Sequence, residues 1–199
     1  MHTRKPSVLF LLVFVMPSLI CQSESRPDSR PIEGETYKST FFGFTYTFPK
    51  GWSRLQQRSQ TSIRLAPGAA LYTLLFATAT PSNGTIGPSD AGVVVLAEDV
   101  SHTDIHNAKD AAVKFADLLS HTRPPHRLIN AGREVTLGGT PFFRIDYEQQ
   151  TFSDVKHYFC SVISVQKGFA LRFSVIADSK VHMDEICDTT RSIGFEQHE

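Results

Sequence analysis

Two short turns in the second half of the chain restrict how its longest apolar segments can be arranged. One turn is Gly138-Gly139 and the other is Lys167-Gly168. A turn this short joins antiparallel neighbours and needs residues that accept a positive φ, which glycine does most readily. The segments around the turns are rich in β-branched and aromatic residues, which favour strands. We therefore expect hairpins built from strands at residues 128–137, 140–149, 156–166 and 169–177.

A further strand is predicted where aromatic residues alternate with small ones, in the segment FFGFTYTFPKGW. Four aromatic residues occupy every second position from Phe42 to Phe48, which is the period of a strand with one buried face. Most of this aromatic density is therefore expected to be core. Phe41 and Trp52 fall outside the alternation, and we interpret these two residues as candidate surface aromatics.

Two helices are predicted beside the strands. Apolar residues recur at helical spacing between Asp104 and Thr122, and Asp104 could accept hydrogen bonds from N–H groups of the first turn. Ser179 could cap a second helix near the C-terminus in the same way. Further apolar strands are expected at residues 71–79 and 92–97. Hairpins with helices between and after them indicate an α+β fold, an α/β/α sandwich in which helices cover an antiparallel sheet.

The N-terminal segment has the layout of an export signal. Arg4 and Lys5 precede an apolar run of thirteen residues, whereas a helix that spans a bilayer needs about 20. We therefore assign residues 1–21 to a signal peptide, the polar, proline-containing residues 22–36 to a flexible tether, and residues 37–199 to one globular domain. No transmembrane segment is expected in the mature chain.

The three cysteines suggest different roles. Cys21 follows the apolar run directly, where bacterial lipoproteins carry their lipid, but Ser18 and Ile20 depart from the residues that such signals prefer. We favour ordinary cleavage near Cys21 over a lipid anchor. An exported protein meets oxidising conditions, so Cys160 and Cys187 could form a disulfide. The alternative is that both are small buried hydrophobic side chains.

Charge and motif content argue against several classes of function. The chain has 20 Lys and Arg residues against 20 Asp and Glu residues, so no nucleic-acid binding is predicted. A Walker phosphate loop and the GxGxxG, HExxH, GxSxG and CxxC motifs are all missing from the sequence. We therefore assign no catalytic residue, no cofactor and no metal ligand.

Histidine and arginine residues around the first predicted helix were considered as sites. His102 and His106 are four residues apart, but the helix is predicted to begin after His102, so we interpret both as solvent-exposed rather than as metal ligands. A basic group from Arg123 to Arg133, which includes His126, is either a solvated loop or a site for an anion or an acidic partner.

Three motifs together resemble the PsbP-like proteins: GFTYTFPKGW at residues 43–52, LGGTPFFRIDYE at residues 137–148 and KGFALRFSVIADS at residues 167–179. That resemblance implies an α/β/α sandwich, a fold shared with a Ran-binding nuclear transport factor and with DcrB-type envelope lipoproteins. It also implies a role as a binding or assembly factor with no shared catalytic constellation.

These features predict an exported, non-enzymatic module, periplasmic or extracellular, that binds an unidentified protein partner or assists envelope assembly. One alternative is a metal-binding or small-ligand-binding protein, and another is a hydrolase with a dispersed active site. A cleft that gathers polar groups with perturbed pKa values would favour the enzyme, whereas a broad exposed apolar patch would favour the protein-binding module.

Overall fold

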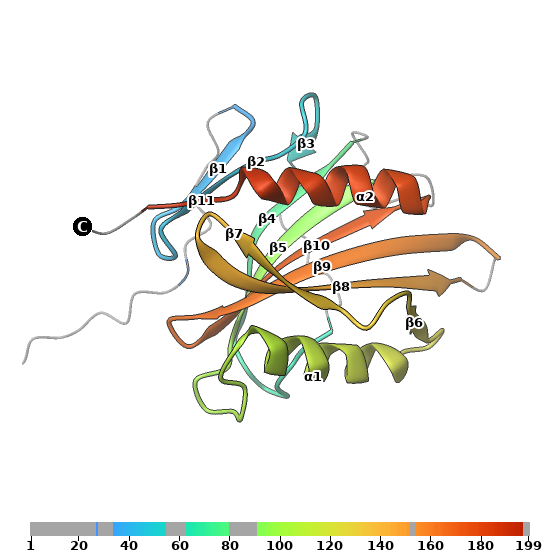
Figure 1. Ribbon diagram of the computed structural model, residues 1–199, viewed down its shortest axis with the longest axis horizontal. Coiled ribbons are helices and arrows are strands. Elements are labelled where there is room, and N and C mark those ends of the chain that lie inside the picture. The colour runs from blue at the N-terminus through green and yellow to red at the C-terminus, as the bar shows by residue number, and fades with distance from the viewer. Residues whose placement is uncertain (1–26, 28–33, 55–62, 80–90, 152–153, 197–199) are drawn as a thin grey trace, which may run out of the picture.

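In the computed structural model of the protein, the described residues are 27, 34–54, 63–79, 91–151 and 154–196. Their fold is the predicted α+β sandwich, in which a broad antiparallel sheet has a helical layer on each face (Figure 1). The predicted signal peptide with Cys21, and most of the predicted tether, lie outside the described residues. None of the described helices is long and apolar enough to cross a membrane.

The main sheet has eight strands in the order β3-β4-β5-β10-β9-β8-β6, with β7 also paired to β8. All of its pairings are antiparallel. The strands are β3 (Ser53–Arg54), β4 (Leu71–Thr78), β5 (Gly92–Asp99), β6 (His126–Leu128), β7 (Arg133–Leu137), β8 (Thr140–Gln150), β9 (Lys156–Gln166) and β10 (Phe169–Ala177).

Both predicted hairpins are present. The turn Gly138-Gly139 joins β7 to β8, and Lys167-Gly168 joins β9 to β10. All four turn residues have a positive φ, as such tight turns require. The predicted turn chemistry therefore sets the order of the four strands at this side of the sheet.

The expected strand at residues 128–137 is wrong in one respect, because it is two short strands. β6 pairs with the far end of β8 and β7 with its beginning, so the chain leaves the sheet between them. Gly132, with φ 79°, lies in this interruption, and a Cβ atom there would come within 2.6 Å of the Phe143 ring. The close approach of backbone and ring requires glycine and bends the chain away from β8.

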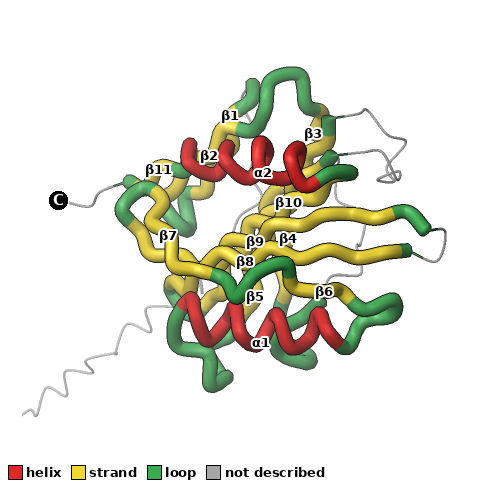
Figure 2. The backbone as a smooth tube through the Cα atoms, turned by 45° about the vertical axis from the view of Figure 1, so that its right-hand side comes forward, coloured by secondary structure: helices red, strands yellow, loops and turns green. Residues whose placement is uncertain are grey.

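Two layers cover the sheet on opposite faces (Figure 2). One face carries helix α1 (Ala108–Ser120). The other carries helix α2 (Lys180–Asp188), the 3-10 helix η1 (Thr189–Ser192) and a small sheet of β1 (Thr36–Ser39), β2 (Phe44–Thr47) and β11 (Gly194–Phe195). β1 thus begins at the last residue of the expected tether.

Each layer packs on the sheet through its own hydrophobic core. The α2-side core includes Tyr37, Phe44, Tyr46, Phe142 and Phe173. The α1-side core includes Ala111, Phe115, Ile145, Tyr147 and Ile163. Because side chains alternate between the two faces of a strand, β8, β9 and β10 contribute to both cores. This alternation explains why their sequences are apolar along almost their whole length.

The two helices confirm one predicted cap and correct the other. Ser179 caps α2, where its hydroxyl accepts a hydrogen bond from the His182 N–H at 3.2 Å. The expected cap at Asp104 is wrong, because α1 begins at Ala108. Asn107 caps it instead, accepting from the Asp110 N–H at 2.9 Å and donating to the Asp110 carboxylate at 2.8 Å. This reciprocal pair satisfies the first turn locally.

The aromatic alternation is confirmed. All four even-position aromatics from Phe42 to Phe48 are buried in the α2-side core. The strand itself starts later than expected, at Phe44, because Gly43 has φ 70° and closes a turn with its N–H bonded to the Ser39 carbonyl. That turn pairs β2 with β1, so the segment is half of a hairpin.

Candidate ligand-binding cavity

A cavity of about 600 Å³ lies beside α1, on the same face of the main sheet. Helix α1 packs on β8, β9 and β6, and the cavity extends from it over β10 and β5. Its apolar lining includes Phe76, Val94, Leu96, Phe115, Leu119 and Ile176. The volume is within the range of sites that bind small molecules, roughly 300–1,000 Å³.

The alternation along β10 selects which of its side chains reach the cavity. Leu171 and Phe173 belong to the α2-side core. Arg172, Ser174 and Ile176 point to the opposite face and line the cavity. The strand FALRFSVIA therefore places Arg172 on the cavity face of the sheet, where it contacts the Phe115 ring of α1.

Arg172 is the most unusual group in the cavity, because only 5% of the residue is exposed. Its guanidinium lies 4.1 Å from the centre of the Phe115 ring, a cation–π contact. Nη2 donates a hydrogen bond to the Ile63 carbonyl at 3.2 Å. Nε and Nη1 have no hydrogen-bond partner among the residues that the structure describes. Burial lowers the pKa of Arg172, although arginine stays protonated in proteins.

Glu98 is the negative charge that acts on Arg172. It lies on β5 and is 2% exposed, and its attraction partly offsets the effect of burial on the pKa of Arg172. Its Oε1 accepts a hydrogen bond from the Ala66 N–H at 2.9 Å. Among the described residues it makes no hydrogen bond to Arg172, whose Nε and Nη1 are unpartnered and whose Nη2 bonds Ile63. Glu98 therefore balances the buried charge without satisfying the donors of the guanidinium.

His126 marks the other end of the cavity. Its ring contacts Tyr147 and Phe159 edge to face, with centroid distances of 5.4 and 5.3 Å. Nδ1 lies 2.7 Å from the Thr122 hydroxyl oxygen. Burial lowers the pKa of His126 to about 4, so the ring is neutral at neutral pH. Arg172 is therefore the buried cation of the described cavity lining, while Arg123 lies exposed at the His126 end.

A chain of hydroxyl groups crosses the sheet between these two ends. Tyr147 stacks on Phe159 at 4.9 Å, and its hydroxyl lies 3.2 Å from the Ser161 oxygen. Ser161 in turn lies 2.8 Å from the Ser174 oxygen. Burial raises the pKa of Tyr147, which keeps its hydroxyl protonated. These three hydroxyls bond to one another, and none of them is paired with a histidine among the described residues.

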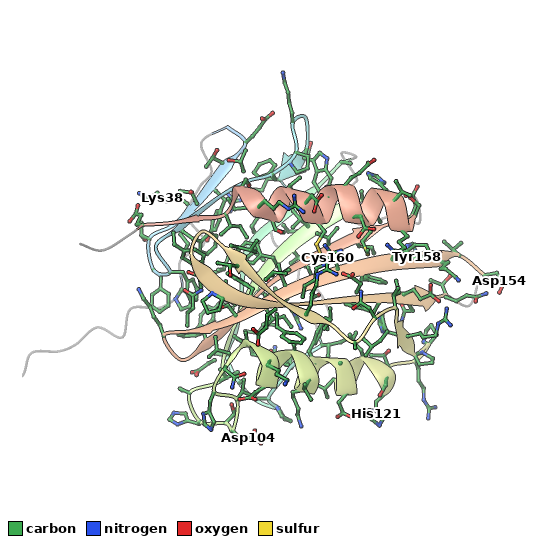
Figure 3. All side chains as sticks on the ribbon, in the orientation of Figure 1. Lys38, Asp104, His121, Asp154, Tyr158 and Cys160 are labelled. Carbon is green, nitrogen blue, oxygen red and sulfur yellow. A yellow bond between two sulfur atoms is a disulfide. The ribbon has the colours of Figure 1, made fainter. Side chains whose placement is uncertain are left out.

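The predicted cysteine pair lies on the other side of the sheet from this cavity. The structure joins Cys160 of β9 to Cys187 of α2 in a disulfide, with the two Cα atoms 6.3 Å apart. Figure 3 shows the sulfur–sulfur bond between α2 and the sheet. Both residues are buried in the α2-side core. The bridge therefore holds α2 to the sheet and does not contribute to the cavity.

The two candidate surface aromatics are partly buried and pack against the α2-side core. The Phe41 ring contacts Phe42 and Phe169 edge to face, at 4.7 and 5.5 Å. Trp52 packs against the same core just before β3. Their use as a partner-binding surface stays a prediction. The structure does not bring them near the cavity lining, which lies on the other face of the sheet.

The histidines and basic residues considered in the sequence are spread over several places. Figure 3 shows Asp104 and His121 at opposite ends of α1, so the helix-end histidines do not meet. No group of three or more His, Cys, Asp or Glu residues that could hold a metal ion occurs among the described residues. Of the basic group, Arg123 and His126 line the cavity, whereas Arg127 pairs with Glu148.

Sequence reasoning missed Arg172, although a signal was present. The residue lies within the quoted motif KGFALRFSVIADS, and a lone charge in a strand that is apolar on both faces requires a partner. What the sequence did not indicate is that this position lies beside an open cavity instead of under α1.

Structural comparison places this architecture among known folds. The chain is similar to the solution structure of cyanobacterial PsbP (CyanoP) from Synechocystis, with a TM-score of 0.55, 14% identity, and coverage of 87% of this chain and 99% of that one. The chain has a PsbP-like fold. At this identity, the likeness concerns the fold alone and not a function.

Two crystal structures are more weakly similar. LpqN from Mycobacterium tuberculosis, described as involved in cell envelope biogenesis, matches with a TM-score of 0.48 and 13% identity over 86% of this chain and 90% of that one. A protein of unknown function from Pseudomonas aeruginosa matches with a TM-score of 0.46 and 14% identity over 77% and 92%. No family model matches the sequence, and no curated protein matches it.

Proposed function

We propose that this protein is an exported, non-enzymatic binding protein whose PsbP-like domain holds a small apolar molecule in the cavity beside α1. The observation that carries the proposal is the cavity itself: about 600 Å³, with mostly apolar lining and few polar groups. Small-molecule sites in proteins have this composition, because apolar walls supply affinity and a few polar groups fix orientation.

Export is supported by two independent features. Residues 1–21 have the layout of a signal peptide, followed by a polar tether. The Cys160–Cys187 disulfide is a second argument, since disulfides persist in oxidising compartments and are rare in the cytosol. We therefore propose a periplasmic or extracellular location, with Cys21 removed or lipidated by the processing of the signal.

A small ligand is better supported than the protein partner expected from the sequence. The large apolar residues that are exposed in the described structure are Val113, Leu128 and Val181, on three separate elements. Isolated residues of this kind are normal on a protein surface and do not form an interaction patch. An enzymatic role is also less supported. The Tyr147, Ser161 and Ser174 hydroxyls are bonded to one another, and the Thr122 hydroxyl beside His126 is bonded to the carbonyls of Leu119 and Pro124.

Binding of a neutral fluorescent probe, N-phenylnaphthylamine, tests the proposal. We expect the purified protein to bind the probe with an increase in fluorescence. The variant Val94→Phe adds a ring inside the cavity and is expected to weaken binding by about tenfold or more, because the space for the probe is lost. Val181→Phe is the matched control, since Val181 is 70% exposed on α2 and should leave binding unchanged.

Two results would contradict the proposal. One is a wild-type protein that binds neither the probe nor other neutral apolar molecules. The other is a Val94→Phe variant that is folded, by circular dichroism and thermal unfolding, yet binds the probe as the wild type does. In either case the cavity would not be the binding site.

A further inference from the structure

We infer that Arg172 anchors the carboxylate of an amphipathic ligand whose apolar chain occupies the cavity. The inference rests on the proposed function and specifies its ligand class: a singly charged carboxylate with an unbranched apolar chain. It follows from the unpaired donors of Arg172, the charges around them and the shape of the lining.

Most of the N–H donors of Arg172 are buried without hydrogen-bond partners. This is unusual, because the great majority of buried donors in proteins have a partner. Nε and Nη1 together carry three of the five N–H groups of the guanidinium. They have no partner among the described residues, while Nη2 bonds only the Ile63 carbonyl. A bound anion would satisfy them. The site is therefore incomplete without a ligand of negative charge, although the fold is complete.

The geometry of the donors favours a carboxylate. The guanidinium is planar and presents N–H groups in pairs, which match the two oxygens of a carboxylate. Each such pair includes Nη2, together with either Nε or Nη1. Nη2 uses one of its two N–H groups for the Ile63 carbonyl, so its second N–H and one neighbouring donor can still bind a carboxylate. The contact with the Phe115 ring restricts movement of the guanidinium. Ser174, on the same face of β10 two residues further on, adds a hydroxyl within the cavity lining.

The surrounding charges favour a single negative charge over a phosphate dianion. Four other titratable groups face Arg172 or share its cavity, and one of them, Arg123, is exposed at the far end beside His126. Glu98 contributes a negative charge on the neighbouring strand, whereas Tyr147 and His126 are neutral. One carboxylate on the ligand would be attracted by Arg172 and weakly repelled by Glu98. A dianion would double its attraction to Arg172 and its repulsion by Glu98 alike, while the cost of removing its charge from water rises more steeply than the charge. One buried cation therefore compensates a single negative charge better.

The lining continues from Arg172 as an apolar path. Ile63 lies at the Arg172 end, and Ile176 follows on the same face of β10, roughly 13 Å along the strand at 3.3 Å per residue. Ile176 pairs with Phe159, whose ring contacts His126 at the opposite end. The path is thus long in one direction and has its buried cation at one end, which suits a linear chain with a terminal carboxylate.

Three ligands of equal chain length separate the contributions of head and chain: decanoate, decanol and decyl phosphate. Their affinities for the purified wild-type protein are measured by displacement of N-phenylnaphthylamine, or by calorimetry if the probe does not bind. We expect decanoate to bind about tenfold or more tightly than decanol, because charge-assisted hydrogen bonds are made only by the acid. Decanoate is also expected to bind more tightly than decyl phosphate.

Variants of Arg172 then test the anchor. Arg172→Met, which keeps the length and apolar stem of the side chain, should remove the preference for decanoate over decanol. Arg172→Lys keeps the charge but not the planar pair of donors, and should reduce the preference partly. Arg191→Met, at an arginine exposed on η1, is the control that should leave the preference intact. If Arg172→Met does not fold, the anchoring role is still tested by the preference of Arg172→Lys and by the relative affinities of the wild type for decanoate and decanol.

The possible failures are distinguishable. If decanol binds as tightly as decanoate to the wild type, or if Arg172→Met keeps the preference, the anchor is refuted while the cavity remains a binding site. If decyl phosphate binds more tightly than decanoate, the carboxylate assignment is wrong. If none of the three ligands binds, the proposed function fails together with the anchor.

Discussion

Reduction of the Cys160–Cys187 disulfide is expected to lower the free energy of unfolding by about 3.5 kcal/mol. The two cysteines are 27 positions apart in the sequence. A cross-link that closes a loop of this length removes about 12 cal/mol/K of chain entropy from the unfolded state, which is about 3.5 kcal/mol at 25 °C. For a domain of this size, each kcal/mol corresponds to about 2–4 °C, so the melting temperature should fall by roughly 7–14 °C.

The assay is urea unfolding of the wild-type protein with and without reductant, followed by circular dichroism. Reduction breaks the bond between the sulfur atoms but removes neither of them. The difference in the free energy of unfolding with and without reductant therefore reports the effect of the cross-link itself. The double variant Cys160→Ala/Cys187→Ala should lose more, because both side chains are buried and their truncation leaves a void in the α2-side core. A thiol titration of the denatured, unreduced protein should detect neither Cys160 nor Cys187.

Two observations would refute the reasoning. If both thiols react in the denatured, unreduced protein, the bridge does not form in solution. If the bridge forms but its complete reduction changes the free energy of unfolding by less than about 1 kcal/mol, loop entropy does not control the stability of this domain, and residual structure in the unfolded chain would be the physical explanation.

Two further predictions concern the α1 side and one hairpin. His126 has a folded-state pKa of about 4, below its ordinary value of 6.5, so the unfolded state takes up the proton first. The wild type should therefore lose about 1–2 kcal/mol more than His126→Phe between pH 6.5 and 4, since the partial exposure of the ring lowers the full value of roughly 3 kcal/mol. The same pH dependence of the free energy of unfolding in both proteins would contradict this. Gly138→Ala should destabilise the protein by about 2 kcal/mol more than Gly139→Ala in urea unfolding. Both glycines have a positive φ, but only at Gly138 would a Cβ meet another backbone atom, the Ile193 oxygen at 2.7 Å, so equal losses would exclude the clash.

The elements that could be predicted from the sequence are those fixed by neighbouring residues. Positive-φ turns at Gly138-Gly139 and Lys167-Gly168 define hairpins locally, and the alternation from Phe42 to Phe48 defines a buried face without knowledge of what covers it. The predicted start of α1 at Asp104 is wrong because helical spacing of apolar residues does not by itself locate the capping residue. Asn107 caps the helix, since its side chain and that of Asp110 satisfy each other.

The candidate site could not be predicted in the same way, because it depends on distant elements. Periodicity shows that Arg172 lies in an apolar strand, but not which part of the sheet α1 covers. That position is decided by the packing of α1 on β8, β9 and β6, which leaves the cavity over β10 and β5. His126 and Phe115, at the two ends of the site, are brought to one face of the sheet from separate segments.

The disulfide has a topological consequence for the response of the chain to a protease. Strand β10, with Arg172, lies between Cys160 and Cys187 in the sequence, as does the exposed Lys167 of the preceding turn. A trypsin-like protease that cuts after Lys167 would therefore break the chain without releasing a fragment. The two pieces would stay covalently joined and could keep their strand pairing, so that a nicked molecule would retain the strand on which the proposed ligand recognition depends.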